Sequence, residues 1–447
     1  MGRKVIIVSL GCDKNLVDTE MMLGMLAERG YVFTDDETEA EAAVINTCCF
    51  IGDAKEESVN TILDFAGLKK NGSLKALIVT GCLAQRYREE IRKEIEEVDA
   101  VLGTMAFDRI AETLDQVFAG GAQDQYDALD RKPLTDRKRV VTTGGHFAYL
   151  KIAEGCDKHC TYCIIPKVRG PYRSIPMESL LREAETLAEQ GVKELILVAQ
   201  ETTVYGVDLY GRKALPELLR NLCRIDGLVW IRLLYCYPEE IDDELLVTIK
   251  EEEKICHYLD LPIQHASDSV LKRMGRRTKQ AELTEIVNHI RREIPDICLR
   301  TTLISGFPGE TKKDHEELLS FVEKMHFDRL GVFPYSREED TVAADLPGQL
   351  SEKVKRARRD EIMALQQEIA FDRAADMVGK TVLAIIEGKV ADEEVYVART
   401  YRDAPDVDGL LFCHTERELM TGDFVRVRVT DSCEYDLMGE LEDEFAE

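Results

Sequence analysis

The sequence alternates short, continuously apolar runs with amphipathic stretches of helical spacing, in two separate series. A continuous apolar run is typical of a strand buried on both faces, and strands that alternate with helices form parallel sheets. In the first series, residues 15–30 place leucines and methionines at helical spacing and end at Gly30. We therefore expect residues 1–135 to form a doubly wound parallel-sheet domain of the α/β class. Its strand-like runs are residues 4–10, 42–48, 75–82 and 100–104.

A polar stretch at 121–145 separates the two series, and we place the linker itself at 136–146. The second series has strand-like runs with amphipathic helices between them, such as 177–191. Six strand–helix units predict a partial (βα)6 barrel, short of the eight units that close a TIM barrel. This domain covers 147–376, because the long helical run 351–379 trails the barrel. The six runs are residues 147–155, 194–200, 229–235, 258–264, 298–306 and 329–336.

The remaining residues, 377–447, carry short β-like segments divided by turns, which predict a small all-β barrel. Residues 378–447 hold 7 basic and 18 acidic side chains, within a chain whose formal net charge is −27. Such a charge repels phosphate groups. We therefore do not expect nucleic acid as the substrate, and we expect a basic partner instead.

The length and the cysteine content indicate a multidomain metal or redox protein. A chain of 447 residues exceeds one compact core and implies two or three domains. No apolar stretch is long enough to span a bilayer, and the first residues lack a signal peptide's cleavage region. We therefore expect a cytoplasmic protein without a membrane partner. In that reducing compartment, 13 cysteines favour metal or redox chemistry over disulfides.

Three cysteines lie within eight residues in the spacing C-x3-C-x2-C, and we call Cys156, Cys160 and Cys163 the loop triad. They follow the first strand of the predicted barrel, at the end where barrel active sites are built. Three thiolates can ligate three irons of a 4Fe–4S cube and leave the fourth iron open. A structural zinc site needs four ligands, so the zinc alternative requires His159 or a distant residue as well.

Three more cysteines, Cys12, Cys48 and Cys82, each follow an apolar strand of the first domain, and we call them the N-terminal triad. The ends of parallel strands share one edge of a sheet, so these distant thiols can converge there. This arrangement predicts a second 4Fe–4S cluster with one iron open. The strand period of two points Cys49 to the opposite face, which indicates a structural role. The other cysteines show no ligand spacing and are expected to be core or surface thiols: Cys223, Cys236, Cys256, Cys298, Cys413 and Cys433.

The loop EGCDKHCTYCIIPKVRG (154–170), with Tyr162 before its last cysteine, resembles the radical S-adenosylmethionine (SAM) enzymes. The resemblance covers about 147–340 and implies that the open iron chelates the amino and carboxylate groups of SAM. An electron passed through this cluster would then cleave SAM to a 5′-deoxyadenosyl radical. The resemblance also implies SAM contacts on two other segments: TTLISGFPGET (301–311), with Gly306 and Gly309 near the adenine, and VAQET (198–202), with Gln200 and Glu201 near the amino group.

The whole arrangement resembles the methylthiotransferases, which join an N-terminal cluster domain, a radical SAM barrel and a C-terminal TRAM β-barrel. The resemblance implies two 4Fe–4S clusters, with SAM as both methyl donor and radical source. One SAM molecule would methylate sulfur held at the N-terminal cluster, and another would generate the radical that removes a substrate hydrogen. The resemblance also implies an electron donor such as a flavodoxin or a ferredoxin.

One branch of this family modifies adenosine in transfer RNA, and another modifies the β-carbon of an aspartate in small-subunit ribosomal protein twelve. Asp403, Asp406 and Asp408 crowd one loop, where they would repel RNA and suit a lysine- and arginine-rich ribosomal protein. Transfer RNA stays the alternative substrate, and a non-catalytic zinc-dependent binding module is a remote alternative. Three stretches resemble the protein-modifying branch: SLGCDKNLVDTE (9–20), EGCDKHCTYCIIPKVRGPYRSIP (154–176) and ARTYRDAPDVDGLLF (398–412).

Four polar residues on the predicted barrel strands are candidates for holding the target aspartate. Each either faces the barrel cavity or serves as a structural polar group, and the sequence leaves both readings open. These residues are Arg232, Tyr235, Gln264 and Arg300.

Overall fold

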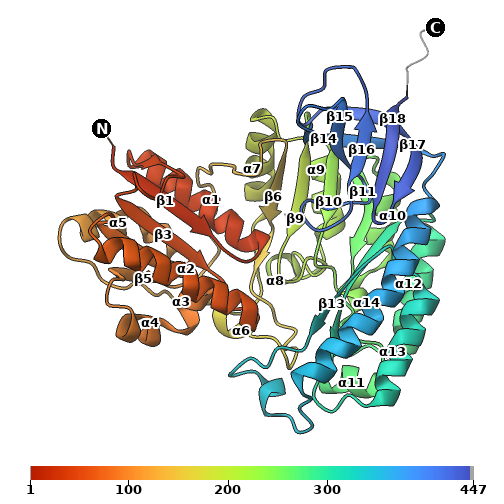
Figure 1. Cartoon of the computed structure of the whole chain (residues 1–447), viewed down its shortest axis with the longest axis horizontal. Coiled ribbons are helices and arrows are strands. Elements are labelled where there is room, and N and C mark those ends of the chain that lie inside the picture. The colour runs from red at the N-terminus through yellow and green to blue at the C-terminus, as the bar shows by residue number, and fades with distance from the viewer. Residues whose placement is uncertain (1, 443–447) are drawn as a thin grey trace.

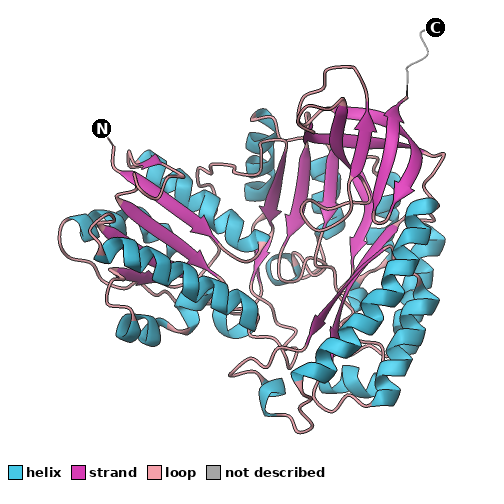
Figure 2. Cartoon of the chain, in the orientation of Figure 1, coloured by secondary structure: helices cyan, strands magenta, loops and turns pink. Residues whose placement is uncertain are grey.

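The computed structural model describes residues 2–442 (Figure 1). In chain order, these residues form an open parallel sheet, a larger curved parallel sheet and a closed five-stranded barrel, with helices packed around the first two (Figure 2). Within residues 2–442, no helix is both long enough and apolar enough to cross a membrane.

The first sheet is parallel and has helices on both faces. In spatial order its strands are β2 (Val32–Phe33), β1 (Lys4–Ser9), β3 (Ala42–Thr47), β4 (Ala76–Gly81) and β5 (Ala100–Leu102). Its helices are α1 (Asp13–Glu28), α2 (Gly52–Lys70), α3 (Cys82–Arg86), α4 (Arg88–Glu94), η1 (Phe107–Arg109) and α5 (Ile110–Phe118). Side chains alternate along β3, because Val44 packs with α1 and α5 whereas Ile45 packs with α2. The strands are thus apolar on both faces, which confirms the predicted doubly wound sheet.

The connection between the first two sheets, residues 119–146, lies against the protein although its sequence is polar. Gly24 of α1 contacts it so closely that a Cβ there would lie 2.0 Å from the carbonyl oxygen of Lys138. The buried Arg139 forms an ion pair with Glu20 of α1 and another, at 2.9 Å, with Glu183 of the next domain. The connection therefore fixes the first domain against the second.

The second sheet contains the six predicted barrel strands, all parallel. In spatial order they are β13 (Arg329–Pro334), β12 (Cys298–Ser305), β11 (Ile255–Asp260), β10 (Trp230–Leu233), β9 (Glu194–Val198) and β6 (Phe147–Lys151). The sheet does not close on itself, because β13 and β6 are its edges. This confirms the partial six-unit barrel. Its helices include α7 (Met177–Glu189), α9 (Leu215–Cys223), α10 (Asp243–Glu251), α12 (Gln280–Glu293) and α13 (Lys312–Met325).

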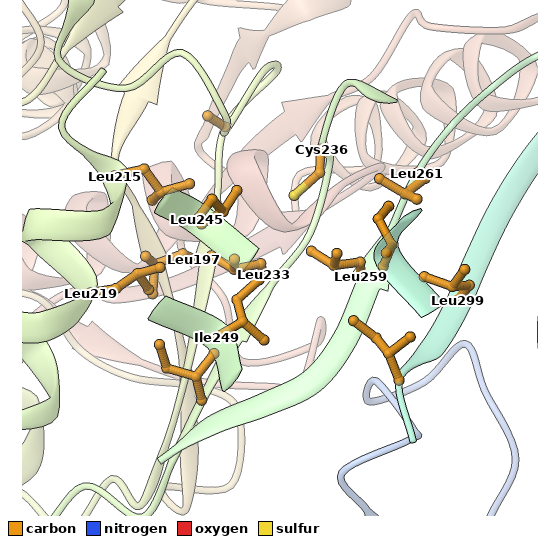
Figure 3. Packing of buried hydrophobic residues seen from close by; sticks show 14 of the residues in the cluster. Leu197, Leu215, Leu219, Leu233, Cys236, Leu245, Ile249, Leu259, Leu261 and Leu299 are labelled. Atoms are coloured by element: carbon orange, nitrogen blue, oxygen red, sulfur yellow. The ribbon is translucent and has the colours of Figure 1, made fainter. Parts of the chain in front are cut away.

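The helix-facing side of this sheet forms an extended apolar core (Figure 3). Leu197, Leu233, Leu259 and Leu299 come from four neighbouring strands and are buried together with helix residues such as Leu219. Burying one leucine contributes about 1.5–3 kcal/mol relative to leaving it exposed. This core therefore fixes the strands whose opposite face carries the polar side chains described below.

Short elements build the loops at the carboxyl ends of these strands. The antiparallel pair of β7 and β8 encloses residues 155–172, which carry the loop triad. The short elements are β7 (Ala153–Glu154), α6 (Ile165–Val168), β8 (Arg173–Ser174), α8 (Val207–Tyr210), η2 (Pro238–Glu240), α11 (Asp268–Arg273) and η3 (Val342–Asp345).

A long helix, α14 (Glu352–Ala375), packs along β13 and leads into the closed barrel at the top of Figure 1. This confirms the predicted all-β barrel at the C-terminal end. In spatial order its strands are β14 (Thr381–Lys389), β15 (Val395–Thr400), β16 (Leu411–His414), β18 (Asp436–Leu441) and β17 (Phe424–Cys433). The β-like segments predicted from the sequence are residues 381–388, 394–401, 409–414 and 423–431. They do not include β18, because Gly439 fills a buried position of that strand and removes the apolar alternation. A Cβ there would lie 2.5 Å from Cγ1 of Val427.

Candidate iron–sulfur sites

The N-terminal triad lies at one edge of the first sheet, where β1, β3 and β4 end. Cys48 follows β3 directly, Cys82 is the first residue of α3 after β4, and Cys12 precedes the first turn of α1. The turns before two of these cysteines require glycine, since Gly11 has φ +91° and Gly81 has φ +94°. The turns bring all three cysteines to the shared edge.

The side chain of Asn15 ties the three cysteine-bearing turns together. Its amide nitrogen donates to the carbonyl oxygen of Leu10, just after β1, at 2.9 Å and to that of Thr47, at the end of β3, at 3.0 Å. Its amide oxygen lies 3.9 Å from the sulfur of Cys82. Because Asn15 is fully buried, these contacts are shielded from water.

The thiols of the N-terminal triad are close enough to influence one another. Burial, and next the charge of the neighbouring Cys82 and Cys12, raises the pKa of Cys48 to about 12. A Cβ on Gly11 would lie 2.7 Å from the sulfur of Cys48, so the turn before Cys12 also touches Cys48. Cys49 is buried among apolar side chains on the α2 face of the sheet.

The loop triad lies between β7 and β8, at the carboxyl end of the barrel. The backbone N–H of Cys156 donates to the carbonyl oxygen of Gly170 at 3.2 Å, and that of Cys163 donates to Cys160 at 3.0 Å. The sulfur of Cys160 lies 2.7 Å from the hydroxyl oxygen of Tyr237, on the loop after β10. Burial raises the pKa of Cys156 to about 11 and that of Cys163 to about 12.

The chemistry of both triads fits an iron–sulfur cluster. Their donors are all cysteine sulfur, the ligand that holds such clusters, and buried thiolates need the positive charge that cluster iron supplies. In a cluster each thiolate binds its own iron, whereas zinc draws all of its sulfur ligands to within about 2.3 Å of one point. Among residues 2–442, no group of three or more His, Cys, Asp or Glu side chains is arranged to hold a single metal ion.

Gln200 and Glu201, predicted near SAM, follow β9 close to the loop triad. Burial raises the pKa of Glu201 to about 7. One of its oxygens accepts from the N–H of Thr203 at 3.0 Å, and the other lies 3.8 Å from the ammonium of Lys158 without a hydrogen bond from residues 2–442. Gln200 donates to Glu154 at 3.3 Å, and its own amide oxygen has no partner in this part of the chain. Each residue thus has an acceptor free for a ligand.

The two glycines predicted near the adenine are required by packing within the chain. Gly306 has φ +72°, and a Cβ there would lie 2.5 Å from Cγ of Lys355 on α14. Gly309 has φ +76°, and a Cβ there would lie 2.6 Å from Nη1 of Arg273 on α11. Protein groups, rather than a ligand, therefore account for glycine at both positions, and contact with the adenine stays a prediction.

Two of the four polar candidates on the barrel strands make contacts between domains. Arg232 is fully buried, and its guanidinium donates to Glu194 at 2.7 Å and to the carbonyl oxygen of Tyr401 at 2.6 Å. It therefore fastens the C-terminal barrel to the sheet. The hydroxyl of Tyr235 donates at 3.0 Å to Asp13, the residue after Cys12.

The other two candidates differ from each other. Gln264 has φ +70°, and its backbone N–H donates to the carbonyl oxygen of Thr302 at 2.9 Å, which joins the segment after β11 to β12. Arg300 lines a cavity of about 450 Å³ between β12, β13, α14 and the C-terminal barrel. An oxygen of Asp408 lies 3.9 Å from its Nε, beyond hydrogen-bond distance. Arg300 is therefore the candidate that lines a cavity.

The aspartate-rich loop of the C-terminal barrel differs from the prediction. Asp403 is 2% exposed and pairs with Arg329, and the carboxylate of Asp408 accepts from the hydroxyl of Tyr258 at 2.7 Å. Of the three aspartates, Asp406 alone is exposed. The prediction that these three side chains repel RNA and suit a basic protein is wrong for Asp403 and Asp408, because both bind groups of the partial barrel instead.

Comparisons with known proteins identify the family of the chain. Family models match for the uncharacterized protein family UPF0004 over residues 4–103, the radical SAM superfamily over 150–322 and the TRAM domain over 378–441. A relative from Lachnoclostridium phytofermentans is 62% identical, over 98% of this chain and 100% of its own length. A relative from Acetivibrio thermocellus is 50% identical over 99% of each chain. Both are named ribosomal protein uS12 methylthiotransferase RimO. The chain belongs to the RimO family.

A RimO-family chain is a SAM-dependent radical methylthiotransferase, with SAM and 4Fe–4S clusters as its cofactors. Solved structures share the fold at low identity. The radical SAM methyltransferase TsrM from Kitasatospora setae, with cobalamin and a [4Fe-4S] cluster bound, is 14% identical with a TM-score of 0.53 over 75% of each chain. The cobalamin-dependent enzyme OxsB is 12% identical with a TM-score of 0.50, over 82% of this chain and 56% of that chain.

Two residues of this RimO-family site escaped the sequence analysis. Asn15 and Arg169 both contact Cys82, and both lie within the quoted cysteine-bearing stretches. Their position close to the cysteines in the sequence was the one signal that could have identified them as site residues. Only the fold shows that their side chains meet at the same sulfur.

Proposed function

We propose that this chain replaces a hydrogen on the β-carbon of an aspartate in uS12, the small-subunit ribosomal protein twelve, with a methylthio group. The observation that carries the proposal is that one loop of the partial barrel contacts a cysteine of each triad. Arg169 donates to the sulfur of Cys82 at 3.3 Å, and the next residue, Gly170, accepts from the backbone of Cys156. Relatives named for this activity, 47–62% identical over nearly the whole chain, support it.

In this proposal the loop triad holds the 4Fe–4S cluster that binds SAM, and the N-terminal triad holds the second cluster. When bound, the clusters and SAM supply the radical, the sulfur and the methyl group. The residues of the chain hold both clusters in partly enclosed sites and orient SAM through the free acceptors of Gln200 and Glu201. We place the protein in the cytoplasm, because all 13 of its cysteines are free thiols. The electron donor in this proposal is a flavodoxin or a ferredoxin, as the family resemblance implies.

A basic protein suits this chain better than RNA does. The net charge of −27 attracts a lysine- and arginine-rich partner and repels phosphate. The attraction comes from the net charge of the whole chain, since Asp403 and Asp408 are engaged in internal contacts. The feature that favours transfer RNA, the second candidate, is the pair of exposed arginines Arg426 and Arg428 on β17.

Arg300 is our proposed ligand for the carboxylate of the target aspartate. Partly exposed and buried residues alternate along β12, so Arg300 lies on the face opposite the helices. Its neighbour on β11, Asp260, accepts at 3.0 Å from the N–H of Tyr235, whose hydroxyl reaches Asp13 beside Cys12. A guanidinium donates two parallel hydrogen bonds to a carboxylate. Arg300 therefore has the right chemistry, and Asp260 and Tyr235 connect it to the segment that carries Cys12.

A two-substrate assay tests the proposed function. Enzyme reconstituted anaerobically with iron and sulfide is incubated with SAM, a reductant and either uS12 or transfer RNA, and the products are analysed by mass spectrometry. We expect a methylthio group on an aspartate of uS12 and none on the RNA. Modification of the RNA alone would contradict the proposal, and zinc in place of iron and sulfide would favour the zinc-binding module.

A further inference from the structure

Arg169 lies where the two cysteine-bearing regions meet. It follows the loop triad in the sequence and is 1% exposed. Its backbone N–H donates to Ile165 at 2.8 Å, and the next carbonyl, of Gly170, accepts from Cys156. A loop that belongs to the partial barrel therefore holds this side chain in place.

The guanidinium of Arg169 reaches across the domain boundary to the N-terminal triad. Its Nε donates to the sulfur of Cys82 at 3.3 Å, and its Nη2 donates to the side-chain oxygen of Asn15. Its Nη1 donates to Asp18 of α1 at 2.7 Å and to Glu154 at 3.3 Å. All three nitrogens are thus engaged, and the contact with Cys82 is the one directed at a predicted cluster ligand.

Two carboxylates and two cations are paired beside this contact. Asp18 and Glu154 are buried carboxylates, and Arg169 and Lys151 are the buried cations that contact both of them. Hydrogen bonds to the sulfurs of an iron–sulfur cluster stabilise its reduced, more negative state and raise its reduction potential. The Nε–H of Arg169 is placed to act on Cys82 in this way, whereas the ion pairs of Lys151 are with Asp18 and Glu154.

We propose that Arg169 is a positioning residue of the barrel domain that orients the Cys82 thiolate and raises the reduction potential of the N-terminal cluster. The proposal rests on the proposed function, because it takes Cys82 as a cluster ligand. It assigns the barrel domain a direct part in setting the properties of a cluster bound by the first domain.

The test isolates the N-terminal cluster. In a full-length background with Cys156→Ala, Cys160→Ala and Cys163→Ala, the remaining cluster is reconstituted and its midpoint potential is measured by electron paramagnetic resonance during a redox titration. We expect Arg169→Gln to shift the potential to more negative values. Arg169→Lys keeps the charge but loses the planar fork, so we expect a smaller shift in the same direction. Lys151→Gln is the matched control, because it removes a cation from the same carboxylates without removing a sulfur contact.

The outcomes separate this proposal from the proposed function. An unchanged potential in Arg169→Gln, or an equal shift in Lys151→Gln, would overturn the role of Arg169. Loss of iron from Arg169→Gln, with iron kept by Lys151→Gln and by Arg169→Lys, would support the orientation of Cys82. If the parent background itself binds no cluster while circular dichroism shows it folded, the proposed function fails instead.

Discussion

The backbone N–H of Cys156 donates to the carbonyl oxygen of Gly170 at 3.2 Å, one residue along the chain from the arginine that contacts Cys82. Two cysteines from different domains are thus held by consecutive residues of one loop. The two triads are neighbours in space, although each is built by its own sheet. We expect the two triads to serve one reaction, and we expect substitutions in one triad to disturb a different step from substitutions in the other.

Alanine substitution in the two triads should separate SAM cleavage from methylthio transfer. We expect Cys160→Ala to abolish both 5′-deoxyadenosine formation and uS12 modification, because the SAM-binding cluster loses a ligand. We expect Cys82→Ala to abolish modification while SAM is still cleaved. Both products are measured by mass spectrometry, with the exposed Cys433→Ala as control. Loss of SAM cleavage in a folded Cys82→Ala protein would refute this division of tasks.

Replacing Asn15 by alanine should loosen the edge that carries the N-terminal triad. The change removes hydrogen bonds to the carbonyl oxygens of Leu10 and Thr47, one of which is buried. A buried group left unpaired costs about 1–3 kcal/mol. We expect the free energy of unfolding in urea to fall by about this amount, together with the iron content of the N-terminal site. Asn288→Ala, on an exposed face of α12, should change neither quantity; equal effects of the two substitutions would contradict the prediction.

The raised pKa of Glu201 gives the iron-free protein a specific pH dependence. Burial raises this pKa from 4.5 to about 7, so the unfolded chain loses the proton at lower pH than the folded chain does. The free energy of unfolding should therefore fall as the pH rises from about 4.5 to about 7, by at most about 3 kcal/mol from this group. Glu201→Gln should remove that loss. The free energy of unfolding of the variant, relative to that of the wild type, should therefore rise between pH 5 and pH 8. A stability difference that is the same at both pH values, as expected for the exposed Glu253→Gln, would show that Glu201 does not titrate in this window.

Arg300 should make the enzyme prefer a charged aspartate over a neutral asparagine at the target position. If its guanidinium binds the aspartate carboxylate, Arg300→Gln should raise the activation free energy by about 1.5–3 kcal/mol. This change lowers kcat/KM for uS12 by roughly ten- to a hundredfold. SAM cleavage without substrate should continue. A uS12 variant with asparagine at the target should be modified equally poorly by both enzymes, and the exposed Arg426→Gln should behave as wild type. Continued preference of Arg300→Gln for aspartate over asparagine would rule Arg300 out.

The strands and the gathering of the cysteines were predictable because both depend on local pattern. Each apolar run predicts a buried strand. A parallel sheet then brings the strand ends before Cys48 and Cys82 to one edge. Neither prediction requires knowledge of contacts between residues that are distant in the sequence. The exception, β18, has glycine at a buried position and so lacks the pattern.

What the sequence did not disclose depends on partners far away in the chain. Asp403 and Asp408 belong to an acidic stretch, yet Arg329 and Tyr258 of the partial barrel bind them. The contact of Arg169 with Cys82 exists only because two domains meet along a buried face. The sequence pattern does not show which distant residues pair. The number of acidic residues in this loop therefore did not predict which of them are exposed.

The most direct measurement follows a single hydrogen atom. The enzyme is given SAM and uS12 that carries deuterium on the β-carbon of its aspartates, and both products are examined by mass spectrometry. Our account predicts deuterium in 5′-deoxyadenosine and a methylthio group on the aspartate that lost it. Deuterium retained in full on a methylthiolated uS12, or a methylthio group on another residue type, would contradict it.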